Sequence, residues 1–137
     1  MMEVKIFLTA DYANVDSSNK LNILGAFTQI QARNLPAVLI HLYVVAQLAF
    51  DWSEEGHRIV FIRLFNPDTK ELAILSFEFD IPKAPFGQTS RVTILAPMQN
   101  VIFEEFGAYE FKLFMGEDHR ASMTVDVGLR SQPKNES

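Results

Sequence analysis

The chain has 137 residues, of which 48% are hydrophobic and none is cysteine. This length fits one domain with a sizeable apolar core, and the lack of cysteine excludes a disulfide framework, a thiolate nucleophile and a zinc–thiolate site. The formal net charge is -5, and no cluster of Lys and Arg offers the positive stripe that a phosphate backbone requires, so we expect no nucleic-acid partner.

Apolar and polar residues alternate in short runs along the whole chain, a period of two that is typical of strands with one buried face. Turn signals separate these runs. The pattern predicts eight strands, which are Glu3–Ala10, Leu21–Ala32, Ile40–Phe50, His57–Phe65, Glu71–Ile81, Thr89–Leu95 (with an extension to Val101 left open), Tyr109–Met115 and Ala121–Val127. We therefore expect an all-β fold, a single antiparallel β-sandwich of immunoglobulin-like or jelly-roll type over residues 1–129, followed by a flexible tail over residues 130–137.

Two of these runs carry features of their own. Ile40–Phe50 is nearly all apolar, which suits a central strand covered on both faces. The alternative for this region is a helix over Pro36–Phe50, because proline suits the first helical position. Gly25 lies in the middle of Leu21–Ala32, where it indicates a bulge or a close backbone approach.

The inward faces of the later strands define the expected core. Phe77 and Phe79 lie on the apolar face of one alternating strand, and Phe111 and Leu113 lie on that of another, so we expect all four to be deeply buried. Gly116 opens the tight connection between the last two strands, where a positive φ is expected.

No part of the chain indicates export or membrane insertion. The first residues carry no basic region followed by a long apolar stretch, which argues against a signal peptide. The longest mostly apolar run, Leu35 to Phe50, contains Pro36, His41 and Gln47 and is too short and too polar to span a bilayer. We expect a soluble cytoplasmic protein without membrane contact.

Several segments resemble an uncharacterised family of small bacterial proteins. They are Leu8-Thr-Ala-Asp-Tyr-Ala-Asn14, Lys20-Leu-Asn-Ile-Leu-Gly25, Leu35-Pro36 and Gly107-Ala-Tyr-Glu-Phe111, so the resemblance covers almost the whole chain. It implies a bacterial, β-rich, single-domain protein and supplies no catalytic residues, because the function of the family is unknown. The Gly-x-Tyr-x-Phe pattern is also similar to the last hairpin of many immunoglobulin-like and jelly-roll sandwiches.

The candidate ligand-binding residues are Asp11, Tyr12 and Asn14 at the end of the first strand, together with Trp52. An aromatic ring beside Asx side chains can bind a ligand at the rim of a cleft. The alternative is structural, since Asx residues at strand ends satisfy turn amides and aromatic rings pack on sheet edges. No nucleophile elbow, P-loop, dinucleotide fingerprint or histidine cluster is present, so we predict no catalytic residues, no metal site and no cofactor.

The aromatic residues exceed what one inward face can hold. Phe61 and Phe65 lie on a strand that is apolar on both faces, and Phe114 interrupts an outward polar series. These three residues form an apolar surface for a partner, or they are covered by the Pro82–Gly87 loop. The sequence thus favours a non-catalytic binding or assembly module with a protein partner or a homodimer. The alternative is a small enzyme or lectin-like binder that acts on a sugar or nucleotide at one end of the sandwich.

Overall fold

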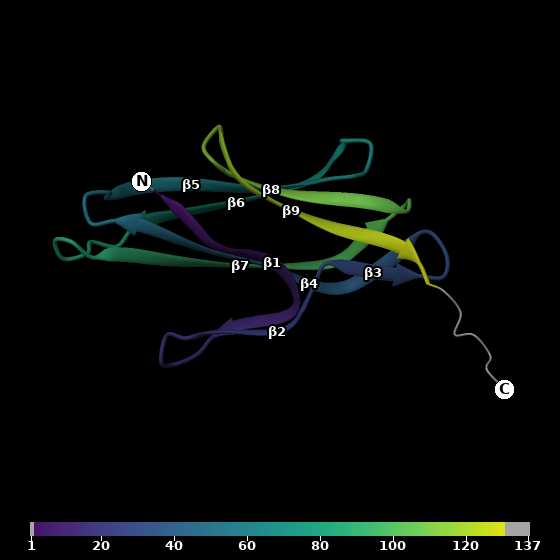
Figure 1. Ribbon diagram of the computed structural model, residues 1–137, viewed down its shortest axis with the longest axis horizontal. Helices are drawn as coiled ribbons and strands as arrows, with labels where there is room; N and C mark the ends of the chain where they lie inside the picture. Colours follow the sequence, from purple (N-terminus) through teal and green to yellow (C-terminus); the bar gives the residue numbers. More distant parts are fainter. Residues whose placement is uncertain (1, 131–137) are drawn as a thin grey trace.

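The computed structural model describes residues 2–130 and arranges them as two β-sheets packed face to face (Figure 1). These residues form nine strands, which are β1 (Glu3–Val15), β2 (Leu21–Phe27), β3 (Gln29–Ala32), β4 (Ala37–Asp51), β5 (Gly56–Phe65), β6 (Glu71–Ile81), β7 (Thr89–Phe103), β8 (Gly107–Met115) and β9 (Asp118–Leu129). One sheet has the order β2–β1–β4–β7, and the other has the order β3–β9–β8–β5–β6. The all-β sandwich is therefore confirmed.

The most apolar run of the sequence forms β4, which lies between β1 and β7 in the four-stranded sheet. Val44, Val45 and Ala46 follow one another along this strand and are all fully buried, so both faces are covered there, whereas Val38 and Ile40 near its start are exposed. The expected central strand is confirmed, and the alternative helix over Pro36–Phe50 is wrong. Val, Ile, Leu and Tyr side chains pack well on a pleated surface, which explains the preference for a strand.

The core lies between the sheets and draws large side chains from both. The fully buried ones include Leu42, Leu48, Phe50 and Phe103 from one sheet and Ile62, Tyr109, Phe111 and Leu113 from the other. The rings of Phe103 and Tyr109 meet edge to face across the core, with their centroids 4.8 Å apart. Such aromatic contacts add to the stabilisation that burial alone provides.

The run Leu21–Ala32, predicted as one strand, is two strands in different sheets. β2 pairs antiparallel with β1, whereas β3 pairs with β9 after the chain crosses between the sheets at Thr28. Because β3 and β9 run parallel, the prediction of an entirely antiparallel sandwich is wrong for this pair. Beyond β9, Arg130 N donates a hydrogen bond to Ala32 O at 2.8 Å, and the rest of the predicted tail, residues 131–137, lies outside the described residues.

β6 forms one edge of the five-stranded sheet, and its bounds agree with the predicted Glu71–Ile81. Phe77 and Phe79 pack against the core but are only half-buried, whereas Phe111 and Leu113 on the inner strand β8 are fully buried. Deep burial is thus confirmed for the second pair and wrong for the first. An edge strand has no neighbour on one side, so water reaches its inward side chains there.

The β8–β9 connection is a two-residue turn of Gly116 and Glu117, flanked by the paired residues Met115 and Asp118. Gly116 has a φ of 60°, as expected, and its N–H donates a hydrogen bond to Ile59 O at 3.0 Å. Glycine with positive φ at the first position is typical of a type II′ hairpin turn, which matches the twist of the flanking strands.

We expect Gly116→Val to lower the free energy of unfolding by about 1–2 kcal/mol, because a β-branched residue is strained at positive φ. An added Cβ would meet nothing within 4 Å, so the cost comes from the backbone alone. Urea unfolding measures the effect. Gly116→Asn is the control and should cost less, since asparagine tolerates this conformation. Equal stability of Gly116→Val and the wild type would contradict the turn assignment.

Candidate functional site

The outer face of the five-stranded sheet carries a surface that we call the outer patch, made of Phe61, Arg63, Phe65, Ile74 and Phe114. Along β5, Phe61, Arg63 and Phe65 alternate with the buried core residues and therefore point away from the core. Phe114 is paired directly with Phe61, and Ile74 with Arg63. The three phenylalanines are half-buried, and Ile74 is 48% exposed.

Arg63 contacts two aromatic rings of the outer patch. Its guanidinium carbon lies 5.8 Å from the centroid of the Phe61 ring and 5.0 Å from that of Phe114, which is cation–π distance. Its Nη1 donates a hydrogen bond to Glu71 Oε1 at 3.1 Å. Nε is buried and has no hydrogen-bond partner among residues 2–130. Arg63 is thus a planar cation in contact with two aromatic rings.

Charged neighbours surround the outer patch. Lys112 Nζ lies 5.0 Å from the centroid of the Phe65 ring and 3.2 Å from Glu110 Oε1. The His119 ring lies 5.1 Å from the Phe114 ring, centroid to centroid. The arrangement is an aromatic centre with a polar rim, which is the usual composition of a protein–protein interface.

The Pro82–Gly87 loop makes its aromatic contact elsewhere. Phe86 packs on Trp52 with ring centroids 4.4 Å apart, and both rings remain exposed, at 82% and 43%. Phe86 therefore covers part of the predicted ligand-binding residue Trp52. The predicted partner residues Phe61, Phe65 and Phe114 instead contact one another's strands and the cations Arg63 and Lys112.

The predicted ligand-binding residues Asp11, Tyr12 and Asn14 make contacts within the four-stranded sheet. The Asp11 side chain lies against Gly25, where a Cβ would come within 2.4 Å of Asp11 Oδ2. Gly25 has a φ of 68°, so both the close approach and the irregular backbone are present at this position. The Tyr12 ring meets that of Tyr43 edge to face at 5.3 Å, and Asn14 is paired with Asn22.

The predicted ligand-binding residues do not form one site. Tyr12 contacts Tyr43, near the middle of β4, whereas Trp52 follows the last residue of that strand. Trp52 is nine residue steps along the chain from Tyr43, which corresponds to roughly 30 Å in an extended strand. Asp11, Tyr12 and Asn14 therefore lie at a different part of the four-stranded sheet from Trp52.

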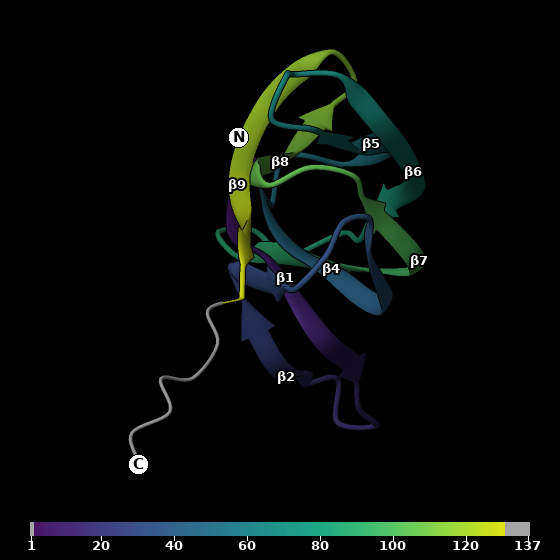
Figure 2. The same cartoon turned by 90° about the vertical axis from the view of Figure 1, so that its right-hand side faces the viewer.

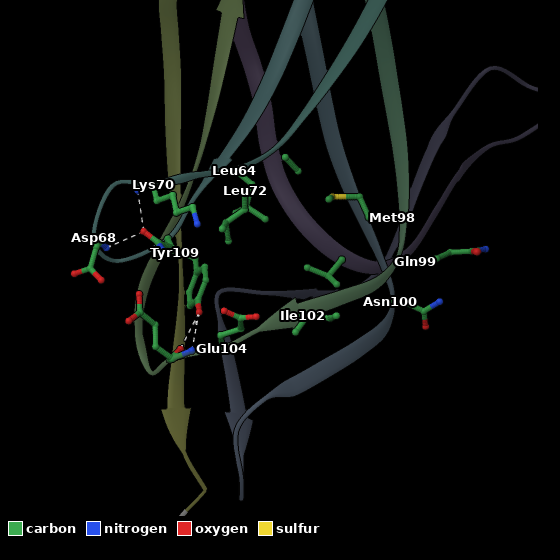
Figure 3. Close-up of a pocket in the computed structure, with 14 residues that line it drawn as sticks. Leu64, Asp68, Lys70, Leu72, Met98, Gln99, Asn100, Ile102, Glu104 and Tyr109 are labelled. Atoms are coloured by element: carbon green, nitrogen blue, oxygen red, sulfur yellow. Dashed lines mark hydrogen bonds between the residues drawn. The ribbon is translucent and has the colours of Figure 1, made fainter.

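A feature that the sequence did not reveal is a cleft of about 630 Å³ at one end of the sandwich, which we call the end cleft. It opens between the edge strands β6 and β7, which lie on the same flank of the molecule (Figure 2). The turn between β5 and β6 and the connection between β7 and β8 complete it. Figure 3 shows Leu72, Met98, Ile102 and Tyr109 around the cleft, with Gln99 and Asn100 pointing away.

Acidic side chains dominate the rim of the end cleft. Asp68, Glu104 and Glu105 line it, with Lys70 as the basic residue among the lining side chains. Desolvation raises the pKa of the Glu105 carboxyl above its usual value, and the negative charges of Asp68 and Glu104 raise it further. Glu105 Oε1 is buried and lacks a hydrogen-bond partner within residues 2–130. The rim thus favours a positive charge and disfavours a further negative one.

Tyr109 fixes the connection that carries two of these carboxylates. The tyrosine is fully buried, its hydroxyl donates a hydrogen bond to Glu105 O at 2.9 Å, and it accepts one from Glu105 N at 3.2 Å (Figure 3). A tyrosine near the start of a strand that bonds back to the backbone a few residues upstream is the tyrosine corner of immunoglobulin-type sandwiches.

Glu78 and Asp80, which share the outer face of β6, both contact His57. The two ring nitrogens of His57 lie 3.3 Å from Glu78 Oε2 and 3.2 Å from Asp80 Oδ1. All three side chains are more than half exposed, so these are solvated contacts that contribute little to stability.

The fold and its surfaces define a class of protein, a β-sandwich domain with an aromatic patch on one sheet and an acidic cleft at one end. The chain belongs to the family of unknown function DUF6941, whose family model matches residues 5–128. This agrees with the resemblance of the sequence to an uncharacterised family. No curated protein matches the chain.

Solved structures with a similar fold share little sequence with the chain. A β-glucosidase from Listeria innocua in complex with isofagomine matches with a TM-score of 0.53 and 10% identity, covering 93% of this chain and 16% of that one. The chain thus spans a small part of that enzyme's length, and the likeness concerns the fold alone. An immunoglobulin-like protein from Pseudomonas aeruginosa matches with a TM-score of 0.42 and 18% identity, covering 91% of this chain and 96% of that one.

Residues 2–130 include no helix with the length and apolar character needed to cross a membrane.

Proposed function

We propose that this protein is a non-catalytic assembly module of a bacterial cell that associates with a second copy of itself through the outer patch. The observation that supports it is Arg63, whose guanidinium lies over the rings of Phe61 and Phe114 and which is paired across the strands with the exposed Ile74. Aromatic residues and arginine are the residue types that dominate binding energy at protein interfaces. Phe, Ile and Arg side chains bind, but they supply neither a nucleophile nor a general base.

The geometry of the outer patch suits a two-fold dimer. Phe61 and Phe114 occupy the inner strands β5 and β8, with Ile74 on the neighbouring strand β6. In a two-fold interface the same patch meets itself, so the phenylalanines of both copies form an apolar centre. Each Glu71 and Glu110 on the rim can then face an Arg63 or Lys112 of the other copy, since the patch carries both signs of charge.

Light scattering at micromolar concentration tests this proposal. We expect the wild type to be a dimer, and we expect Phe61→Lys and Phe114→Lys each to raise the dissociation constant at least about 30-fold, as a hot-spot loss of about 2 kcal/mol requires. The far-UV spectrum should keep its β-sheet form.

The matched control is Leu24→Lys, which introduces the same charge at an apolar residue that is 68% exposed on β2 in the other sheet. It should leave the dimer intact. A wild type that stays monomeric throughout the micromolar range would refute the proposal, and so would a dimer that both phenylalanine substitutions leave unchanged.

A further inference from the structure

We propose that the end cleft is a docking site for an extended peptide segment of a partner protein, in which a basic side chain lies beside apolar ones. The inference is independent of the outer patch, because no residue of that patch lines the cleft. It rests on three features of the cleft, namely its shape, its charge and the two strand edges that flank it.

The shape and floor of the end cleft suit a ligand with apolar side chains. Its volume of about 630 Å³ falls within the range of ligand-binding pockets. Apolar side chains reach it from both sheets, with Leu64 and Leu72 on one side and Met98 and Val101 on the other. Leu72 is 41% exposed, so a ligand that covers it removes apolar surface from water.

The charge of the rim selects a cation. Asp68, Glu104 and Glu105 contribute three carboxylates against the one ammonium of Lys70. Desolvation, and then the negative charges of Asp68 and Glu104, raise the pKa of Glu105. The same negative charges would repel a ligand carboxylate or phosphate. A lysine or arginine side chain relieves this repulsion and forms charge-assisted hydrogen bonds with the carboxylates. The same charge argues against the nucleotide that the sequence left open for this end of the sandwich.

The flanking strands favour an extended ligand. Within the described residues, β6 pairs with β5 alone and β7 with β4 alone, so each presents an outer edge beside the cleft. Extended peptides bind such edges by adding a strand, with main-chain hydrogen bonds for affinity and side-chain pockets for specificity.

Of the two edges, β6 is the better template. Leu72 and Ala73 of β6 line the cleft, and from Ala73 to Ile81, leading away from the cleft, its register with β5 is unbroken. On β7, Asn100 has a φ of 53° and stands within the stretch that lines the cleft, which interrupts the regular edge. We therefore assign the peptide backbone to the β6 edge, with its side chains alternating between the cleft and solvent.

A titration followed by NMR of ¹³C-methyl methionine tests the proposal. The probe is an end-capped heptapeptide of alternating valine and lysine, and the matched peptide has glutamate in place of lysine. Met98 lines the cleft and Met123 does not, so the proposal expects a saturable shift of the Met98 methyl resonance with the lysine peptide, none with the glutamate peptide, and no shift of Met123. The Phe61→Lys variant, which is designed to dissociate the proposed dimer, is titrated in parallel. The same Met98 shift in this variant would show that peptide binding in the end cleft does not depend on the dimer.

Variants separate specific docking from general attraction to an acidic protein. Asp68→Asn combined with Glu105→Gln should weaken binding of the lysine peptide at least tenfold. Glu78→Gln removes an equally negative side chain on the outer face of β6 and should leave the affinity unchanged.

Four outcomes would overturn the proposal. The first is no Met98 shift at millimolar lysine peptide, and the second is a glutamate peptide that binds as tightly as the lysine peptide. The third is an unchanged affinity for the lysine peptide after the Asp68→Asn and Glu105→Gln substitutions. The fourth is a Met98 shift that butylamine reproduces at the same concentration, which would make the cleft a small-amine site. N-methylation of alternate amides removes the N–H groups that a peptide needs to pair with β6. A methylated lysine peptide that binds as tightly as the unmethylated one would refute the pairing with β6.

Discussion

Phe111→Ala is expected to lower the free energy of unfolding by about 3–5 kcal/mol, the usual cost of truncating a buried phenylalanine. Phe111 is 1% exposed on β8, between the buried neighbours Tyr109 and Leu113 of the same face. Its partner strands β5 and β9 fix it on both sides, so the surrounding core cannot collapse easily into the space left behind. Urea or thermal unfolding measures the change.

The control for Phe111→Ala is Phe86→Ala. Phe86 is 82% exposed and contacts the Trp52 ring, so its loss should cost about 1 kcal/mol or less. Similar unfolding midpoints for Phe111→Ala and the wild type would show that β8 faces the opposite way. That result would also move Phe114 into the core and remove it from the outer patch.

Tyr109→Phe is expected to cost about 1–3 kcal/mol, although the ring and its packing remain. The substitution removes the hydroxyl that bonds both Glu105 O and Glu105 N, and it leaves these backbone groups without that partner. Because Glu105 belongs to the rim of the end cleft, the same variant should also weaken the lysine peptide in the NMR titration.

Tyr12→Phe serves as the control for Tyr109→Phe. Tyr12 is 47% exposed and meets Tyr43 edge to face, a contact that phenylalanine preserves, so stability should change by less than about 0.5 kcal/mol. A Tyr109→Phe variant as stable as the wild type would mean that the tyrosine corner does not hold the β7–β8 connection.

Much of the fold is readable from the sequence because alternation reports which face of a strand is buried. The predicted and observed bounds of β6 coincide, and Phe111 and Leu113 on β8 face the core as expected. Alternation does not report which sheet a strand joins. The partly buried residues Leu21, Ile23 and Phe27 of β2 occupy odd positions, whereas Ile30 and Ala32 of β3 occupy even ones, so the alternation changes phase at Thr28. The prediction of one strand over Leu21–Ala32 missed this change of phase.

For a related reason, the sequence does not show which strand lies at the edge of a sheet. Phe77 and Phe79 show the same alternation as Phe111, yet they are half-buried because β6 has a neighbour on one side only. Which strand lies at an edge depends on long-range pairing. A local pattern contains no information about that pairing.

The two candidate sites differ in how much of them the sequence revealed. Phe114 stood out because it broke a polar series, and Phe61 and Phe65 because both faces of their strand were apolar. The end cleft was missed because its halves, residues 64–73 and 98–109, meet only through the topology. The adjacent Glu104 and Glu105 were the one local signal, and two neighbouring carboxylates on a connection are common in any soluble protein.

Cysteine cross-linking tests the outer-patch dimer most directly, because the natural chain contains no cysteine and one substitution therefore reports one position. Ser76 is exposed and paired with Phe61 on the outer face, whereas Ser18 is exposed in the β1–β2 turn of the other sheet. We predict that Ser76→Cys forms a disulfide-linked dimer rapidly under mild oxidation, that Ser18→Cys does not, and that adding Phe114→Lys to Ser76→Cys abolishes the cross-link. Equal cross-linking at the two positions, or a Ser76→Cys cross-link that survives Phe114→Lys, would contradict association through the outer patch.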